Sequence, residues 1–247
     1  MRRFIAIAIA WLLLILAQPA FATFPTVASR AQGCQTVATT SHVFNTSGVT
    51  VGSLVLVFFS FDNTDETPTW PTTIGTFSQL ATGTSSLSEW EVRYTTATAT
   101  SASITITTAG TEISCYSLYV ITGFHPSTVP EAPTAATGAT ATPDPPLLNP
   151  TNWDAEDTLW IAFAHLANAD WSITVAPTNY TNLLANNSAG SNTGVANGTA
   201  ERQLNAASED PGTFTVSPAT NVDWATLLVA VRPAANFNQS QGVMLLP

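Results

Sequence analysis

The sequence predicts an all-β protein that consists of two tandem antiparallel β-sandwich repeats after an N-terminal signal peptide. Three observations predict this architecture: an apolar leader, short runs in which apolar and polar residues alternate, and an internal repeat that covers most of the chain. Helical periodicity is hard to find outside the leader. Pro, Gly, Asn and Thr bound the alternating runs, as they do between strands.

The N-terminus has the order of a secretory leader. Two arginines follow Met1, residues 4–17 are uninterruptedly apolar, and Ala20-Phe21-Ala22 is a small-x-small cleavage site. The run is shorter than a membrane span, which needs about 20 residues, and no later segment is apolar enough to span. We therefore expect cleavage after Ala22, no membrane span in the mature chain, and a secreted or cell-surface location. An uncleaved membrane anchor is the alternative.

The charge of the chain is sparse and acidic. Six arginines and no lysine stand against 16 Asp and Glu residues, which gives a formal net charge of −10. Nucleic acid and anionic membrane surfaces both require a basic patch, so we expect neither as a partner. Cys34 and Cys115 are the two cysteines. In an exported protein we expect a disulfide that ties the first strand of the first repeat to its last strand, with two separate buried thiols as the alternative.

Individual strands are predicted from the spacing of apolar residues. In residues 89–94, Trp90, Val92 and Tyr94 share one face and charged residues share the other, which predicts a strand with one wet face. Residues 54–59 are apolar on both faces, which predicts a central strand that is covered on both sides.

Six segments of the first half recur in the same order in the second half. The matched pairs are 52–59 with 157–163, Trp70 with Trp171, 76–81 with 179–185, Arg93 with Arg202, 104–106 with 214–216, and 117–120 with 226–229. Six matches in order argue for a duplication. Each repeat then has about seven short strands, which is typical of a jelly roll or an immunoglobulin-like sandwich. The sequence leaves open whether the repeats are separate or share one core.

The repeats and the chain ends divide the sequence into four regions. These are the signal peptide (1–22), the first repeat (23–125), a linker with the second repeat (126–234), and a flexible C-terminal tail (235–247). The linker is expected to supply the first strand of the second repeat. The tail is polar up to the apolar residues 243–246, and such an end can add a strand to a neighbour's sheet edge. Sheet edges and tail are therefore the candidate contacts of a homo-oligomer.

Two tryptophans in equivalent loops are the candidate ligand-binding residues. The plane of an aromatic ring stacks on the apolar face of a sugar ring. If the two loops lie at one end of the molecule, Trp70 and Trp171 form two matched sites for a glycan or another surface ligand. The alternative is that each ring closes the end of its own core.

The acidic loop 62–66 is the candidate metal site. It contains Asp62, Asp65 and Glu66, and Ca²⁺ prefers loops that are rich in oxygen ligands. The spacing matches no full calcium motif, and no glycine occupies the required turn. We therefore expect no cofactor and a solvated hairpin tip, with Ca²⁺ as the alternative.

No serine-hydrolase site is predicted. Such a site needs Ser, a His base and an orienting acid. His42, His125 and His165 stand beside no G-x-S-x-G elbow. We expect a packed or surface imidazole at each position.

One pair of carboxylates has the spacing of a glycosidase. Glu89 and Glu91 lie two apart on one strand, which places them about 6.5–7 Å apart and is compatible with sugar cleavage. Laminarinase-like sandwiches carry three alternating acids on this strand, whereas this strand has two before Arg93. The alternative is a solvated face with a contact between Glu91 and Arg93, and we therefore expect no enzyme.

Five segments carry a resemblance to known proteins. They are Gly52-Ser53-Leu54-Val55, Ala141-Thr142-Pro143-Asp144-Pro145-Pro146, Asp157-Thr158-Leu159-Trp160-Ile161-Ala162, Ser208-Glu209-Asp210-Pro211-Gly212 and Val229-Ala230-Val231-Arg232-Pro233. Through them the chain after residue 40 resembles a diffuse group of β-sandwich proteins from environmental bacteriophages and bacteria, which are virion-associated, tail-associated or uncharacterised. The resemblance implies a virion role. The predicted export signal departs from it and favours a secreted or surface protein.

These observations favour an exported, non-enzymatic binding or adhesion module with a carbohydrate as ligand. A structural protein that assembles into a surface layer, fibre or virion is the first alternative. A glycoside hydrolase that uses Glu89 and Glu91 is the second.

Overall fold

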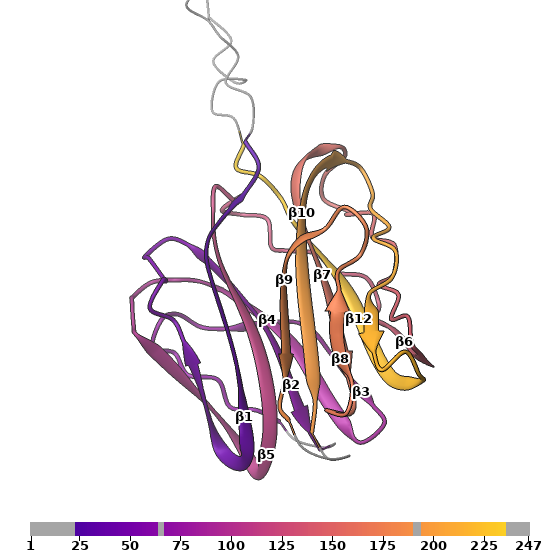
Figure 1. Ribbon diagram of the computed structural model, residues 1–247. Helices are drawn as coiled ribbons and strands as arrows, with labels where there is room; N and C mark the ends of the chain where they lie inside the picture. Colours follow the sequence, from indigo (N-terminus) through magenta and orange to yellow (C-terminus); the bar gives the residue numbers. More distant parts are fainter. Residues whose placement is uncertain (1–22, 64–66, 190–193, 236–247) are drawn as a thin grey trace, which may run out of the picture.

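The computed structural model describes residues 23–63, 67–189 and 194–235, which form an all-β molecule (Figure 1). These residues contain twelve strands and no helix. The strands are β1 (Thr26–Asn45), β2 (Leu54–Asp62), β3 (Ser78–Ser85), β4 (Ser88–Thr96), β5 (Ser103–Thr122), β6 (Ala136–Thr140), β7 (Glu156–Leu166), β8 (Ser172–Val175), β9 (Thr181–Asn187), β10 (Ala196–Ala206), β11 (Thr215–Ser217) and β12 (Val222–Val231). Every pairing between them is antiparallel, so the predicted fold class is confirmed at this level.

Ten strands form two five-stranded sheets. The first sheet has the order β1-β5-β2-β4-β3, the second has the order β6-β12-β7-β10-β9, and β8 pairs with β11 in a separate ribbon. Segments that match in the sequence hold equivalent places, since β2 and β7 are both the central strand of their sheets. β6 lies in the linker, where the first strand of the second half was expected.

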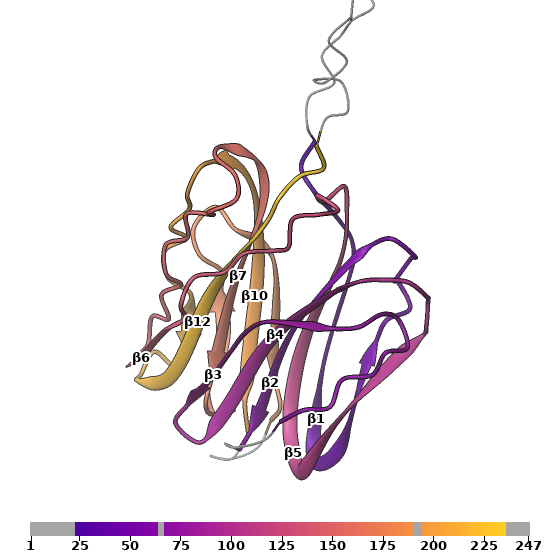
Figure 2. The same cartoon turned by 180° about the vertical axis from the view of Figure 1, so that it is seen from behind.

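The two sheets pack face to face over one core (Figure 2). Its central residues are Leu54, Leu56 and Phe58 of β2, Leu159, Ile161 and Phe163 of β7, and Leu227 and Val229 of β12. The rings of Phe58 and Phe163 meet across the sheets, with their centroids 5.1 Å apart. Of the two arrangements that the sequence left open, the structure therefore has the shared core.

Each sheet also has a core on its outer face, which explains why β2 and β7 are apolar on both faces. β1 and β5 bend where their register shifts between Gln35 and Ser41, and their outer halves fold back over the first sheet (Figure 1). Phe44 of β1 thereby packs on Phe59 of β2, with ring centroids 5.1 Å apart. The β8–β11 ribbon contributes Ile173 to the corresponding outer core of the second sheet.

Two edge strands approach their neighbours closely through glycine. Gly83 of β3 lies opposite Trp90 of β4, and Gly138 of β6 lies opposite Trp224 of β12. A Cβ atom at Gly83 would lie 2.8 Å from the Trp90 ring, and one at Gly138 would lie 2.4 Å from the Trp224 ring. Each tryptophan therefore covers the bare backbone of a sheet edge.

The two ends of the described chain lie together at one end of the molecule (Figures 1 and 2). The amide of Ala234 donates to the Gly123 carbonyl at 2.8 Å, and Gln203 Nε2 donates to the Pro25 carbonyl at 3.0 Å. The predicted signal peptide and residues 236–247 of the predicted tail lie outside the described residues. Within the described part of the chain, no helix has the length and apolarity to cross a membrane.

Candidate ligand groove

Trp70 lies on the outer face of the first sheet, where its partly buried indole packs against the outer core. Its Nε1 donates a 2.6 Å hydrogen bond to Glu91 Oε1. The guanidinium of Arg93 lies 5.5 Å from the ring centroid, and three phenylalanine rings lie within 6.3 Å. These neighbours make Trp70 a packed ring, which corresponds to the alternative reading of this residue.

Glu91 is held by the same cluster. Its carboxylate is almost fully buried, and its second oxygen accepts a 2.8 Å hydrogen bond from Arg93 Nε, so the expected contact is present. Burial raises the pKa of Glu91, while the hydrogen bond from Arg93 opposes this shift. Glu89 and Glu91 share the outer face of β4, but both oxygens of Glu91 are engaged by protein groups. The loop that carries Trp70 covers this face of β4. The prediction that the charged face of this strand is exposed to solvent is therefore wrong at Glu91.

The buried histidines are packed among hydroxyl groups. His165 is fully buried between the sheets, with Nε2 2.8 Å from Ser88 Oγ. Its Nδ1, which an acid would hold in a catalytic triad, has no hydrogen-bond partner in the described part of the chain. Burial lowers the pKa of His165 to about 3, so its imidazole is a poor base. His42 contacts two hydroxyls, Ser114 Oγ at 2.8 Å and Thr108 Oγ1 at 3.1 Å.

Three adjoining pockets form a groove at the end of the molecule that lies opposite the chain ends. A central pocket of about 240 Å³ is lined by Leu87, Asn168, Trp171, Asn221 and Asp223 among others. An acidic pocket of about 290 Å³ is lined by Asp62, Asn63, Leu87, Ser88, Thr111 and Glu112 among others. An edge pocket of about 380 Å³ between β3 and β6 is lined by Thr84, Thr137, Gly138, Asp223 and Trp224 among others. We call these three pockets together the end groove.

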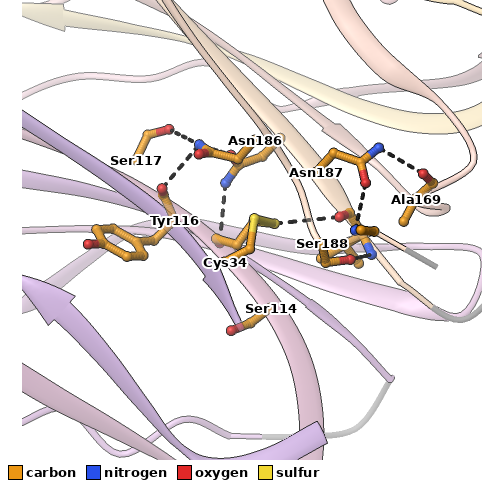
Figure 3. The surroundings of a disulfide bond; sticks show 12 residues. Cys34, Ser114, Tyr116, Ser117, Ala169, Asn186, Asn187 and Ser188 are labelled. Atoms are coloured by element: carbon orange, nitrogen blue, oxygen red, sulfur yellow. Dashed lines mark hydrogen bonds between the residues drawn. A yellow bond between two sulfur atoms is a disulfide. The ribbon is translucent and has the colours of Figure 1, made fainter. Parts of the chain in front are cut away.

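Trp171 lines the central pocket and is fixed by its loop. Its ring is half-buried, and its Nε1 donates to Thr220 Oγ1 at 3.0 Å. Asn187 at the end of β9 holds the loop from behind, because its Nδ2 donates to the carbonyls of Ala169 at 2.7 Å and Trp171 at 2.8 Å (Figure 3). Trp171 lies in the loop between β7 and β8, where its ring packs against the outer core of the second sheet and also lines the central pocket.

The end groove is acidic. Asp62, Glu112 and Asp223 line it, and no basic side chain does so within the described residues. The four arginines that the structure describes each pair with a glutamate elsewhere. Asp62 accepts the backbone N–H of Ile113 and lies beside Glu112, and burial raises its pKa.

Of the three candidate metal ligands, Asp62 lies within the described residues. Asp65 and Glu66 lie outside them. The described residues contain no group of three or more His, Cys, Asp or Glu side chains that could hold a metal ion. Sequence reasoning missed Glu112, which reaches Asp62 because β5 pairs with β2 about 50 residues away along the chain.

The predicted disulfide is present and lies next to the groove wall. Cys34 of β1 and Cys115 of β5 are directly opposed, with their Cα atoms 4.0 Å apart. Beside them, Asn186 donates to the Tyr116 carbonyl at 3.2 Å and to Ser117 Oγ at 3.0 Å (Figure 3). Asn186 precedes the residue that holds the Trp171 loop, so this end of β9 joins the first sheet to the groove.

No family model, curated protein or solved structure matches the chain. The resemblance to β-sandwich proteins of bacteriophages and bacteria therefore stays a prediction.

Proposed function

We propose that the protein is an exported, non-enzymatic binding module that holds a carbohydrate in the end groove. The observation that carries this proposal is the partly buried ring of Trp171, which packs against the outer core of the second sheet and also lines a pocket of about 240 Å³ together with the exposed polar residues Asn221 and Asp223. An aromatic plane packs on the C–H face of a sugar, while amide and carboxylate groups bond to its hydroxyls. Trp70 has no part in this site.

The leader and the disulfide support export of the module. Residues 1–22 have the order of a signal peptide, and disulfides persist in oxidising compartments. The equivalent strand order of the two sheets supports a tandem duplication, in which each repeat supplies one five-stranded sheet and its outer cover. Mass spectrometry of the secreted protein tests the first point, since an intact Met1 contradicts cleavage after Ala22.

A glycan array followed by calorimetric titration of the best binder tests the function. Trp171→Ala should weaken binding about tenfold or more, since one stacking contact contributes about 0.5–1.5 kcal/mol beyond the area that it buries. Trp171→Phe should restore much of the affinity. Val175→Ala is the matched control, because this exposed residue of β8 lies four positions away and outside the groove. An array without any binder, or equal affinities for Trp171→Ala and the native protein, contradicts the proposal.

Assembly through sheet edges is the second candidate function. It is favoured by one observation: β3 and β6 are edge strands that each pair on one side only, and residues of both line the edge pocket. Unpaired strand edges are templates for pairing with another chain, which suits a surface layer, fibre or virion component. Light scattering over two decades of protein concentration separates the candidates, because an independent binding module stays monomeric and an assembling protein does not.

A further inference from the structure

We propose that the end groove takes a linear oligosaccharide of about three units, rather than a single sugar, and that this glycan is neutral or carries amino groups. This inference rests on the proposed carbohydrate-binding function. It adds the length and the charge class of the ligand.

The length follows from the way in which the pockets adjoin. The central and acidic pockets share Leu87 and Ala167. The central and edge pockets share Ser86, Ala139 and Asp223. The three pockets therefore form one continuous path, with Trp171 in the middle. The central pocket of about 240 Å³ is below the usual range of ligand sites, which begins at about 300 Å³, whereas the joined groove is within it.

The turn of the hairpin between β3 and β4 places an apolar side chain along this path. Its turn is held by Ser88, whose Oγ donates to the Ser85 carbonyl at 2.8 Å and also lies 2.8 Å from His165 Nε2. The hairpin tip thereby presents Leu87 with 77% of its surface exposed, between two of the pockets. The C–H face of a sugar that crosses between the two pockets would pack on this side chain.

The charge class follows from the lining. Acidic side chains line both ends of the path, with the half-buried Asp62 in one outer pocket and the exposed Asp223 in the other. Glu112 lies beside Asp62, but it is buried and accepts a 3.1 Å hydrogen bond from Asn63 Nδ2. No Arg, Lys or His side chain among the described residues lines the groove. A polyuronate or sulfated chain would meet like charges along the path, and such contacts disfavour binding. Neutral and amine-bearing chains meet no such repulsion.

The test is calorimetric titration of the secreted protein with one sugar series, from the monosaccharide to the hexasaccharide. We expect the affinity to rise about tenfold or more up to about three units and then to level off. Thr111→Met narrows the acidic pocket alone, and Thr84→Met narrows the edge pocket alone. Each should weaken trisaccharide binding and leave monosaccharide binding unchanged, whereas Trp171→Ala should weaken both.

The outcomes separate the inference from the function on which it rests. Equal affinities for the monosaccharide and the trisaccharide overturn the inferred length and leave the carbohydrate-binding function standing. Tighter binding of an oligouronate than of its neutral counterpart overturns the inferred charge class. Absence of binding to every glycan overturns both the function and the inference.

Discussion

Acid should weaken the fold through His165, the imidazole between the two sheets. The ring is fully buried, Nδ1 has no hydrogen-bond partner within the described residues, and burial lowers the pKa from 6.5 to about 3. The unfolded chain therefore takes up a proton near pH 6.5, and the folded chain does so only near pH 3. Because the unfolded state binds more protons in this interval, stability is fully present above pH 6.5 and is lost as the pH falls toward 3.

The magnitude follows from the two pKa values. Between pH 7.5 and pH 5, this group alone lowers the free energy of unfolding by about 2 kcal/mol. His165→Gln keeps a donor for Ser88 Oγ but takes up no proton. Between pH 7.5 and pH 5, the free energy of unfolding of this variant should therefore fall by about 2 kcal/mol less than that of the native protein. Asp62 and Glu91, whose pKa values are raised by burial, titrate in both proteins and cancel in the difference.

Urea unfolding followed by circular dichroism at each pH provides the assay, with linear extrapolation to water. The quantity of interest is the slope against pH, since the substitution itself also costs stability at neutral pH. If the native protein and His165→Gln lose stability in parallel between pH 7.5 and pH 5, the buried imidazole is not the acid-sensitive group, and the reasoning is refuted.

Three further changes test the packing, each by urea unfolding. Gly138→Ala places a methyl group 2.4 Å from the Trp224 ring and should cost about 1–3 kcal/mol, whereas the exposed neighbour Thr137→Ala should change stability by less than about 0.5 kcal/mol; equal effects would speak against the close approach. Replacing both Cys34 and Cys115 with serine removes the disulfide that closes a loop with a sequence separation of 81, and should lower the free energy of unfolding by about 4 kcal/mol. An unchanged urea midpoint would contradict this prediction. Arg93→Met leaves the Glu91 carboxylate buried without its partner and should cost about 3–5 kcal/mol at pH 7. That cost should shrink in acid, because the carboxyl then takes up a proton, and a cost that is independent of pH would count against the ion pair.

The strands of the fold could be predicted because their pattern is local. The alternation around Trp90 indicates which side chains of β4 point into the core between the sheets. The apolar run that begins at Leu54 indicates a strand that is buried on both faces. The disulfide could be predicted because two cysteines allow a single pairing. Residues 52–59 and 157–163, which match in the sequence, form most of β2 and β7, and each of these strands is the central one of its sheet.

The groove could not be predicted, because its walls are distant in sequence. Residues 84–88, 167–171 and 221–223 meet only when the two sheets pack face to face. The repeat also gave Trp70 and Trp171 the same expected role, yet their surroundings differ. Both rings are partly buried against an outer core, but Trp70 is surrounded by phenylalanine rings and Arg93, whereas Trp171 also lines the central pocket. The surroundings of each tryptophan depend on side chains from other strands. The sequence of each loop alone therefore does not predict them.

The measurement that tests the central claim most directly is an NMR titration of the ¹⁵N-labelled protein with the best glycan from the array. We predict that the shifted resonances cluster at the end groove, with the Trp171 indole N–H and the amides of Ser86, Leu87 and Asn221 among them, while the Trp70 indole N–H stays in place. Shifts that cluster around Trp70, or that spread over surfaces away from the end groove, would contradict the account.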